Sequence, residues 1–414
     1  MAADDEDSNV EEEEEEEEVT DLSSSDVCTK YQEAAKIVNL TMEGLVGQAK
    51  EGASVVALCN FGTQVMEAAA SKLYTKKIKG QPMDRGVAFP ICISVNDVVC
   101  NNSPLASEDM PLLKAGDVVK MDLGCHMDGY IAVAAHTCIV PPAAPDGEEE
   151  AAAALTITPT PTEEQCKVAV AAYNAMLVAA HAISAGATNT SVTKAVERVA
   201  THYGVQPISN VRMHQMKRYV LDGVKEVALK EPTAEEVEKG EEKLEECSFE
   251  QYEAYAVDVA MSTGDGKAKP GELRCTIYKR NVETNYRLKL KASRYVLTEV
   301  DKKFPTMPFS LRHFEDETQA KMGITECVSH GLVTPYPQLH ERSGSVAHFK
   351  CTVLLLGGGT SRVTGLDLPS YFTAPKEPDE ETAKVLQELA EIAAKKAKKK
   401  AAKKKKKKGG AAAS

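Results

Sequence analysis

Residues 118–140 contain two apolar, β-prone runs on either side of an Asp-Gly turn. Two such runs around this turn predict a β-hairpin. With the turn centred between Met127 and Asp128, we expect Asp122 to lie opposite Val133. Facing Cβ atoms in a hairpin are about 5 Å apart, a distance at which two carboxylates can bridge two metal ions. Only one of the two positions carries a carboxylate.

The length of 414 residues predicts two or three structural units, or one large pseudo-repeated fold. There is no apolar run long enough to cross a bilayer, and the first residues are acidic, which argues against a membrane partner and a signal peptide. The 11 cysteines form no C-x-x-C pair and are odd in number. We therefore expect an intracellular protein with reduced, mostly buried thiols and no zinc site.

The net charge of −13 is unevenly distributed along the chain. Residues 1–26 contain fourteen acids and no Lys or Arg, whereas residues 395–408 contain eleven lysines and no acid. Such an acidic run cannot bury enough apolar surface to fold, so residues 1–28 are predicted to be a disordered tail. A solubilising role for this tail is favoured over a specific basic partner. A basic end on an acidic body indicates a polyanionic partner.

Helix-like and strand-like patterns alternate twice along the chain. The predicted helices cover about 29–46, 55–73, 163–177 and 192–203, and the predicted strands cover 91–95, 118–140, 254–260 and 349–356. The Pro-, Ala-, Glu- and Thr-rich stretch 141–162 is interpreted as a flexible insert loop. Two halves, roughly 29–140 and 163–370, thus predict a pseudo-duplicated α+β fold with a site between them.

Residues from about 276 to 341 are mostly helical in pattern and indicate an inserted subdomain. The first part of this segment is basic, with only Glu283 opposing, and is interleaved with tyrosines. The cations are Lys279, Arg280, Arg287, Lys289, Lys291 and Arg294, and the tyrosines are Tyr278, Tyr286 and Tyr295. This combination favours a nucleic-acid backbone and unstacked bases. A solvated helix face is the alternative interpretation.

Residues 373–414 are predicted to form a final helix from Asp379 that runs into a lysine-rich tail. The tail lysines are Lys395, Lys396, Lys398, Lys399, Lys400, Lys403, Lys404, Lys405, Lys406, Lys407 and Lys408. A run of this kind is a generic phosphate-binding arm, although a solubilising or nuclear-localising tail has the same composition. His136 and His330 are single histidines in apolar surroundings, which indicates core or surface residues rather than ligands.

Several long motifs resemble one known family. They are Val118-Val-Lys-Met-Asp-Leu-Gly, Asp128-Gly-Tyr, Ala256-Val-Asp, Thr276-Ile-Tyr-Lys-Arg, Met307-Pro-Phe-Ser-Leu-Arg and Phe349-Lys-Cys-Thr-Val-Leu-Leu. Residues 29–372 resemble the ErbB-receptor-binding, or proliferation-associated, proteins, which are non-peptidase relatives of type II methionine aminopeptidases. The resemblance implies a pseudo-twofold "pita-bread" fold with a helical type II insert. The acidic leader and residues 141–162 depart from the family pattern.

The resemblance also implies that this chain has lost part of the family's metal site. Type II aminopeptidases hold two metals with Asp, Asp, His, Glu and Glu, in that order, and use a further His for catalysis. Matching by motif places Asp122, His214 and Asp258 at ligand positions, Val133 and Lys350 at the other two, and Asn101 at the catalytic His. Val133 offers no donor and Lys350 is positive where a ligand must be negative. We therefore expect no catalysis and no cofactor, with Lys350 paired to Asp122 or Asp258; one weakly held metal is the alternative.

The function that the resemblance implies is a non-catalytic ribosome- and RNA-binding factor acting near the nascent-chain exit. Implied roles are ribosome biogenesis, translation and growth control, with residence in the cytoplasm, nucleus and nucleolus. Implied partners are the large ribosomal subunit, with its rRNA and proteins, structured RNA, and transcriptional or signalling proteins. Alternatives are a pure protein-interaction module and an active methionine aminopeptidase. The basic residues predict an RNA contact dominated by phosphate charge and without base readout.

Overall fold

A computed structural model describes residues 20–76, 80, 82–143, 158–238, 240 and 243–410. Most of the predicted acidic tail and residues 144–157 of the predicted insert loop lie outside these ranges. These two predictions therefore stay predictions.

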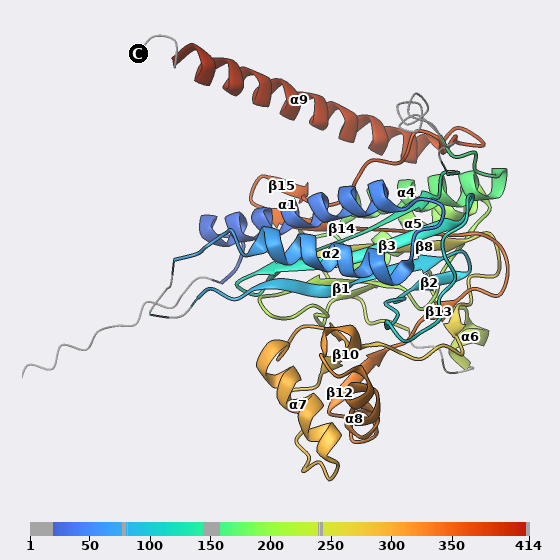
Figure 1. The fold of residues 1–414 in the computed structure, drawn as a ribbon. Coiled ribbons are helices and arrows are strands. Elements are labelled where there is room, and N and C mark those ends of the chain that lie inside the picture. The colour runs from blue at the N-terminus through green and yellow to red at the C-terminus, as the bar shows by residue number, and fades with distance from the viewer. Residues whose placement is uncertain are drawn as a thin grey trace, which may run out of the picture.

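One antiparallel sheet dominates the molecule (Figure 1). Its strand order is β1-β3-β4-β14-β8-β6-β7, with β15 added beside β14 and β5 beside β8. The strands are β1 Arg85–Val95, β3 Val118–Met127, β4 Tyr130–Ile139, β5 Gln206–Pro207, β6 Arg212–Met216, β7 Glu226–Ala228, β8 Ala254–Ser262, β14 Val346–Leu356 and β15 Gly359–Arg362. Strand β1 is longer than the predicted 91–95, because the Gly86–Pro90 segment joins it. Pro90, which has no N–H to donate, falls at a register shift between Phe89 and Cys92.

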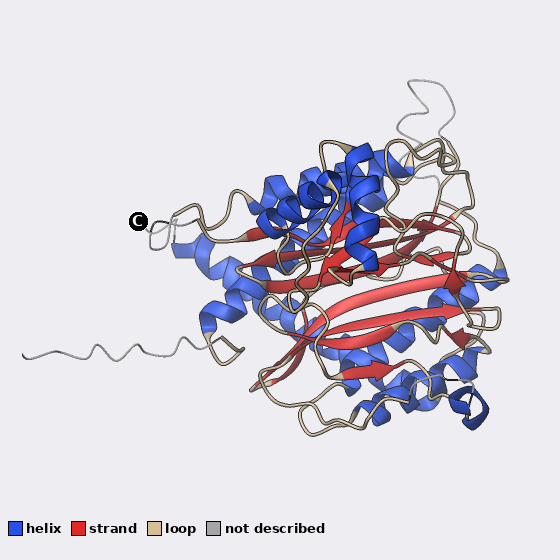
Figure 2. Cartoon of the chain, turned by 90° about the horizontal axis from the view of Figure 1, so that it is seen from below, coloured by secondary structure: helices blue, strands red, loops and turns tan. Residues whose placement is uncertain are grey.

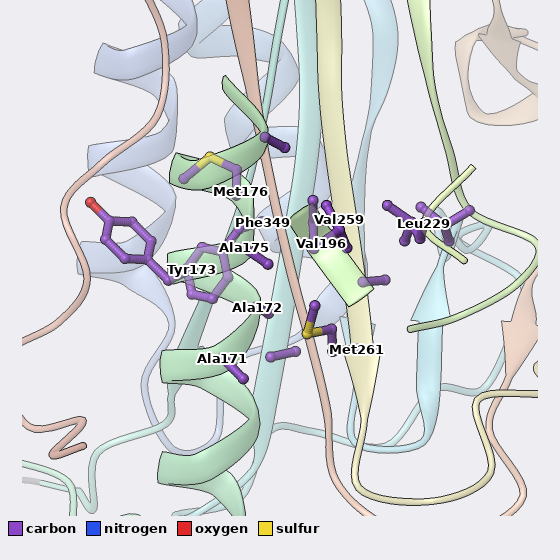
Figure 3. Packing of buried hydrophobic residues seen from close by; sticks show 14 of the residues in the cluster. Ala171, Ala172, Tyr173, Ala175, Met176, Val196, Leu229, Val259, Met261 and Phe349 are labelled. Carbon is purple, nitrogen blue, oxygen red and sulfur yellow. The ribbon is translucent and has the colours of Figure 1, made fainter. Parts of the chain in front are cut away.

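Four helices pack on one face of this sheet (Figure 1). They are α1 Ser25–Gln48, α2 Val55–Ala70, α4 Glu163–Ala182 and α5 Asn189–Tyr203. Figure 2 shows the molecule from below, with helices (blue) behind the strands (red). Helices α1 and α2 share a core with the β1, β3 and β4 strands, and α4 and α5 share another with β8 and β14. Figure 3 shows this second core, where the ring of Tyr173 of α4 lies beside the ring of Phe349 of β14. Each half is thus a helix pair on its own strands, as the alternating pattern predicts.

The β3–β4 hairpin forms, but its predicted register is wrong. Asp128 and Gly129 both have positive φ, 54° and 78°, and form a two-residue turn that pairs Met127 with Tyr130. Asp122 therefore lies opposite Ala135, and Val133 lies opposite Gly124. The pairing moves by two residues, so Val133 stays on the same face as Asp122 without facing it directly.

The segment 276–341 differs from its mostly helical pattern, because it also contains a three-stranded sheet. It comprises β10 Ile277–Arg280, α7 Lys291–Lys303, β11 Phe309–Ser310, the 3-10 turn Leu311–His313, α8 Glu317–Ser329 and β12 Val333–Tyr336. Strands of two to four residues are too short to show a period in the sequence. The subdomain has its own apolar core, which includes Val296, Phe309 and Ile324. It lies on the side of the main sheet away from the four helices (Figure 1).

A small sheet of β2 Val98–Cys100, β13 Leu339–His340 and β9 Lys269–Pro270, and the short helix α6 Ala234–Glu238, complete the body. Helix α9, Glu380–Gly410, packs Val385 near its start against the second core and then extends away from the body (Figure 1). The 11 cysteines are free thiols. Among the residues that the structure describes, no helix is long and apolar enough to span a membrane.

Candidate functional site

A cavity of about 250 Å³ lies between the main sheet and the inserted subdomain. All six positions matched by motif line this cavity, namely Asn101, Asp122, Val133, His214, Asp258 and Lys350. Strand register explains why three of them meet. Lys350 on β14 is opposite Asp258 on β8 and opposite Ala135 on β4, which in turn is opposite Asp122 on β3. The small side chain of Ala135 leaves Lys350 room to reach across it.

Lys350 forms two buried ion pairs at the centre of the sheet. Its Nζ lies 2.7 Å from Oδ2 of Asp122 and 2.8 Å from Oδ2 of Asp258. Oδ1 of Asp258 is 2.6 Å from Nε2 of His348. The four side chains are no more than 11% exposed. The structure confirms the predicted pairing of Lys350 and extends it, because both carboxylates are engaged rather than one.

The ion pairs hold the cluster in its charged form. Burial alone would lower the pKa of the Lys350 ammonium, but Asp122 and Asp258 outweigh that effect and raise the pKa above its ordinary value. Burial would likewise raise the pKa of the Asp258 carboxyl, but Lys350 and His348 lower it. Lys350 is therefore an ammonium, and Asp258 a carboxylate, throughout the neutral range.

The donor set does not fit a pair of divalent ions. Two such ions need bridging carboxylates to offset their mutual repulsion. Here an ammonium lies between the two carboxylates, and Val133 contributes only carbon atoms. His214 retains a buried Nδ1 without a hydrogen-bond partner. Within the described parts of the chain, no group of three or more His, Cys, Asp or Glu is placed to hold a metal ion.

Sequence reasoning missed three further residues of this site, His348, Asp222 and Tyr336. His348 is two positions before Lys350 on the same strand, so the period of two would have placed it on the same face. Asp222 lies in the loop between β6 and β7, where no pattern indicates a partner. Its Oδ2 accepts hydrogen bonds from Lys279 Nζ at 3.0 Å and from the Tyr336 hydroxyl at 2.5 Å. The loop is thereby tied to the inserted subdomain across the mouth of the cavity.

The structure divides the basic residues of the insert into two groups. Lys279 forms an ion pair with Asp222. Arg280, whose side chain is 8% exposed, forms one with Asp301 at 2.9 Å. These two cations are engaged within the chain. The other four, Arg287, Lys289, Lys291 and Arg294, are exposed, but Arg294 also donates to the backbone carbonyls of Leu288 at 3.1 Å and Lys289 at 2.7 Å. Among the tyrosines, Tyr278 is buried, Tyr295 is half-buried, and Tyr286 is exposed.

The eleven tail lysines all fall within α9. Lys395 and Lys398 are exposed, and Lys395 lies 4.0 Å from Glu391 one helical turn earlier. Helix α9 and the inserted subdomain lie on opposite sides of the main sheet (Figure 1). The two basic segments therefore do not form one continuous surface.

The sequence of this chain matches a known family and known relatives. Residues 29–248, more than half of the chain, match the metallopeptidase family M24. The chain belongs to this family. It is 40% identical over 364 residues to ERBB-3 binding protein 1 of Solanum tuberosum, covering 87% of each chain. The family resemblance that the motifs indicate is thus confirmed.

Solved M24-type structures share the fold. The structure of a thermophilic Arx1 superimposes with a TM-score of 0.76 at 27% identity, over 88% of this chain and 98% of that one. Methionine aminopeptidase of Thermotoga maritima gives a TM-score of 0.52 at 15% identity, over 84% and 100%. The expected aminopeptidase-like, pita-bread α+β fold is confirmed.

Proposed function

We propose that the protein is a non-catalytic binding platform that associates with the large ribosomal subunit and with structured RNA near the nascent-chain exit. The observation that carries this proposal is the ammonium of Lys350 lying between Asp122 and Asp258. A lysine in that place removes the charge balance that a dinuclear hydrolytic centre requires. The M24 fold then serves to hold binding surfaces in fixed positions.

The exposed cations support a polyanionic partner. Arg287, Lys289, Lys291 and Arg294 lie on the inserted subdomain, and the lysine run lies in α9. Phosphate contacts by such side chains release counterions, so the affinity falls steeply with salt. Because the two segments lie on opposite sides of the molecule, a large, folded RNA particle suits them better than one short helix (Figure 1). Roles in ribosome biogenesis, translation and growth control, and residence in the cytoplasm, nucleus and nucleolus, belong to the same proposal.

The test combines ribosome co-sedimentation with hydrolysis of a Met-Ala dipeptide. We expect co-sedimentation that weakens with salt, and no hydrolysis with or without added divalent metal. Neutralising Arg287, Lys289 and Lys291 to Gln should weaken co-sedimentation, as should deleting 395–408. A matched control neutralises Lys50, Lys72 and Lys76, which are also exposed but lie on the α1 and α2 side. Metal-dependent hydrolysis by the purified chain would overturn the proposal.

A protein-interaction module is the second candidate, and one observation favours it. A groove between α7 and α8 is lined by Leu290 and Met322, which are 54% and 64% exposed. Exposed apolar side chains gathered in a groove are typical of a protein contact. This candidate is favoured if neutralising Arg287, Lys289 and Lys291 and deleting 395–408 both leave RNA and ribosome association unchanged at physiological salt.

A further inference from the structure

The rings of Tyr286 and His330 stack on one another at the surface of the inserted subdomain. Their centroids are 3.6 Å apart and their planes are inclined by 13°. Tyr286 lies in the loop between β10 and α7, and His330 is the C-cap of α8. Tyr286 is 36% exposed and His330 is also exposed. The pair is therefore a solvent-facing aromatic surface and not part of the subdomain core.

Arg280 holds this aromatic pair together. Its guanidinium donates to the backbone carbonyls of Thr284 at 3.2 Å and of Leu332 at 3.0 Å. Thr284 precedes Tyr286 by two residues, and Leu332 follows His330 by two. These bonds bring the two ring-bearing segments side by side, so Arg280 is a positioning residue rather than a phosphate contact. The stack is built into the subdomain before any ligand arrives.

Exposed cations adjoin the stack in the sequence. Arg287 directly follows Tyr286, and Lys289 and Lys291 come next at alternate positions. The one carboxylate between residues 279 and 294 is Glu283. Glu326, on α8, is already engaged, because its carboxylate accepts the backbone N–H groups of Lys289 and Leu290. An exposed aromatic face next to free cations is the arrangement that proteins use to bind single-stranded nucleic acid.

We propose that the stack of Tyr286 and His330 is a platform for one unpaired base of single-stranded RNA, with the neighbouring phosphates held by Arg287 and Lys289. This inference rests on the proposed function and deepens it by naming the form of RNA bound. Every base has a π-face, so the platform distinguishes single strands from duplexes without reading base identity. Bases in a duplex remain stacked on each other and leave the platform unused.

The absence of tryptophan from the sequence provides a direct test. Tyr286→Trp keeps an aromatic platform and introduces a single fluorescent reporter. We expect quenching by an octamer of single-stranded RNA, little quenching by an RNA duplex of equal charge, and none by heparin, a polyanion without bases. Equal responses to all three, or no quenching by a single strand that does bind, would overturn the platform.

A pair of variants measures the contribution of the platform. Removing an aromatic that stacks on a base costs roughly five- to 150-fold in affinity. We expect Tyr286→Leu to lose affinity in this range for the single strand and less than twofold for the duplex. The slope of affinity against salt should stay unchanged, because no phosphate contact is removed. Val282→Ala is the matched control, since Val282 is 61% exposed in the same loop.

The triple change of Arg287, Lys289 and Lys291 to Gln separates the two proposals. Suppose that this variant binds both RNAs more weakly, whereas Tyr286→Leu either keeps its affinity for both or loses affinity for both equally. The platform is then overturned and the basic surface stands. If the triple variant binds both RNAs as tightly as the natural chain, the proposed RNA surface fails, and the platform fails with it. His330→Ala repeats the test from the other ring, with a single-strand loss expected as well.

Discussion

Two buried lysines on strands of the same sheet show how differently the same side chain behaves in this molecule. Lys350 on β14 lies between two carboxylates, and they raise its pKa. Lys120 on β3, 1% exposed, donates to the backbone carbonyl of Asn96 instead. Burial lowers the pKa of Lys120 to about 7, and the more distant Asp97 only partly opposes this. An adjacent opposite charge, and not burial itself, therefore decides whether a lysine is charged inside this sheet.

Lys350→Met should have the largest effect on stability. The change leaves Asp122 and Asp258 buried without their cation, and breaking a buried pair in this way typically costs about 3–5 kcal/mol. We expect a large drop in the midpoint of urea unfolding. The triple variant Lys350→Met, Asp122→Asn, Asp258→Asn removes the charges together and should recover most of the loss. A single variant with an unchanged midpoint would show that the ion pairs contribute nothing.

Restoring ligands at the same centre tests why no metal pair fits there. Val133→Asp with Lys350→Glu replaces the methyl groups and the ammonium by carboxylates, next to Asp122, His214 and Asp258. Added Mn²⁺ or Co²⁺ should then stabilise the variant, by about 2.7 kcal/mol when the free metal is a hundredfold above its Kd. The natural chain should unfold at the same temperature with metal, without metal and with a chelator. A metal-dependent shift in the natural chain would contradict our account of the site.

The pH dependence of stability sharpens the contrast between the two lysines. The folded state holds Lys120 below its ordinary pKa, so between pH 7 and about 10 the unfolded chain binds more protons. Stability should therefore rise in this window, with an upper slope of roughly 1.4 kcal/mol per pH unit. Comparing the natural chain with Lys120→Met at pH 6 and pH 9 isolates this effect, since the variant lacks it. An identical slope in both proteins would show that Lys120 stays charged.

Asp258 should influence how stability depends on pH at the acid end of the range. Its pKa is lowered in the folded state, so its contribution to stability is present above the unfolded pKa of about 4 and is lost as the pH falls further. Lys350, with a raised pKa, keeps its contribution up to strongly alkaline pH. We expect Asp258→Asn to flatten the acid limb of an unfolding series from pH 5 to pH 2. A limb unchanged by Asp258→Asn would assign the acid sensitivity to other carboxylates.

The smallest effect on stability should come from the exposed cations. Changing Arg287, Lys289 and Lys291 to Gln removes charges that face water, so the free energy of unfolding should stay within about 0.5 kcal/mol. The same change should reduce the slope of log affinity for single-stranded RNA against log salt by about two. Thermal unfolding and binding titrations at several salt concentrations check both halves. A large loss of stability would show that these residues, like Arg280, stabilise the subdomain through contacts within the chain.

Much of the fold could be predicted from local pattern. Periods of about four and two residues indicate the helix at Glu163, the strand at Ala254 and the final helix after Asp379, because side-chain period depends on the chain alone. The motifs around Asp122, Asp258 and Lys350 lead to residues that share one cavity. The short strands of the insert escaped prediction because their pairing depends on packing with one another.

Residue type, period and motifs alone were enough to predict the two pseudo-symmetric halves, the family, and an ammonium at a position where a metal ligand would stand. The folded structure was needed to show that Lys350 bridges both carboxylates, that Asp122 faces Ala135, and that Arg280 supports a loop instead of meeting a phosphate. It also decided that the two basic segments lie on opposite sides of the sheet (Figure 1). The physical reason is range: residue type and period act over one turn or one strand, whereas register, burial and ion pairing depend on which distant segments pack together.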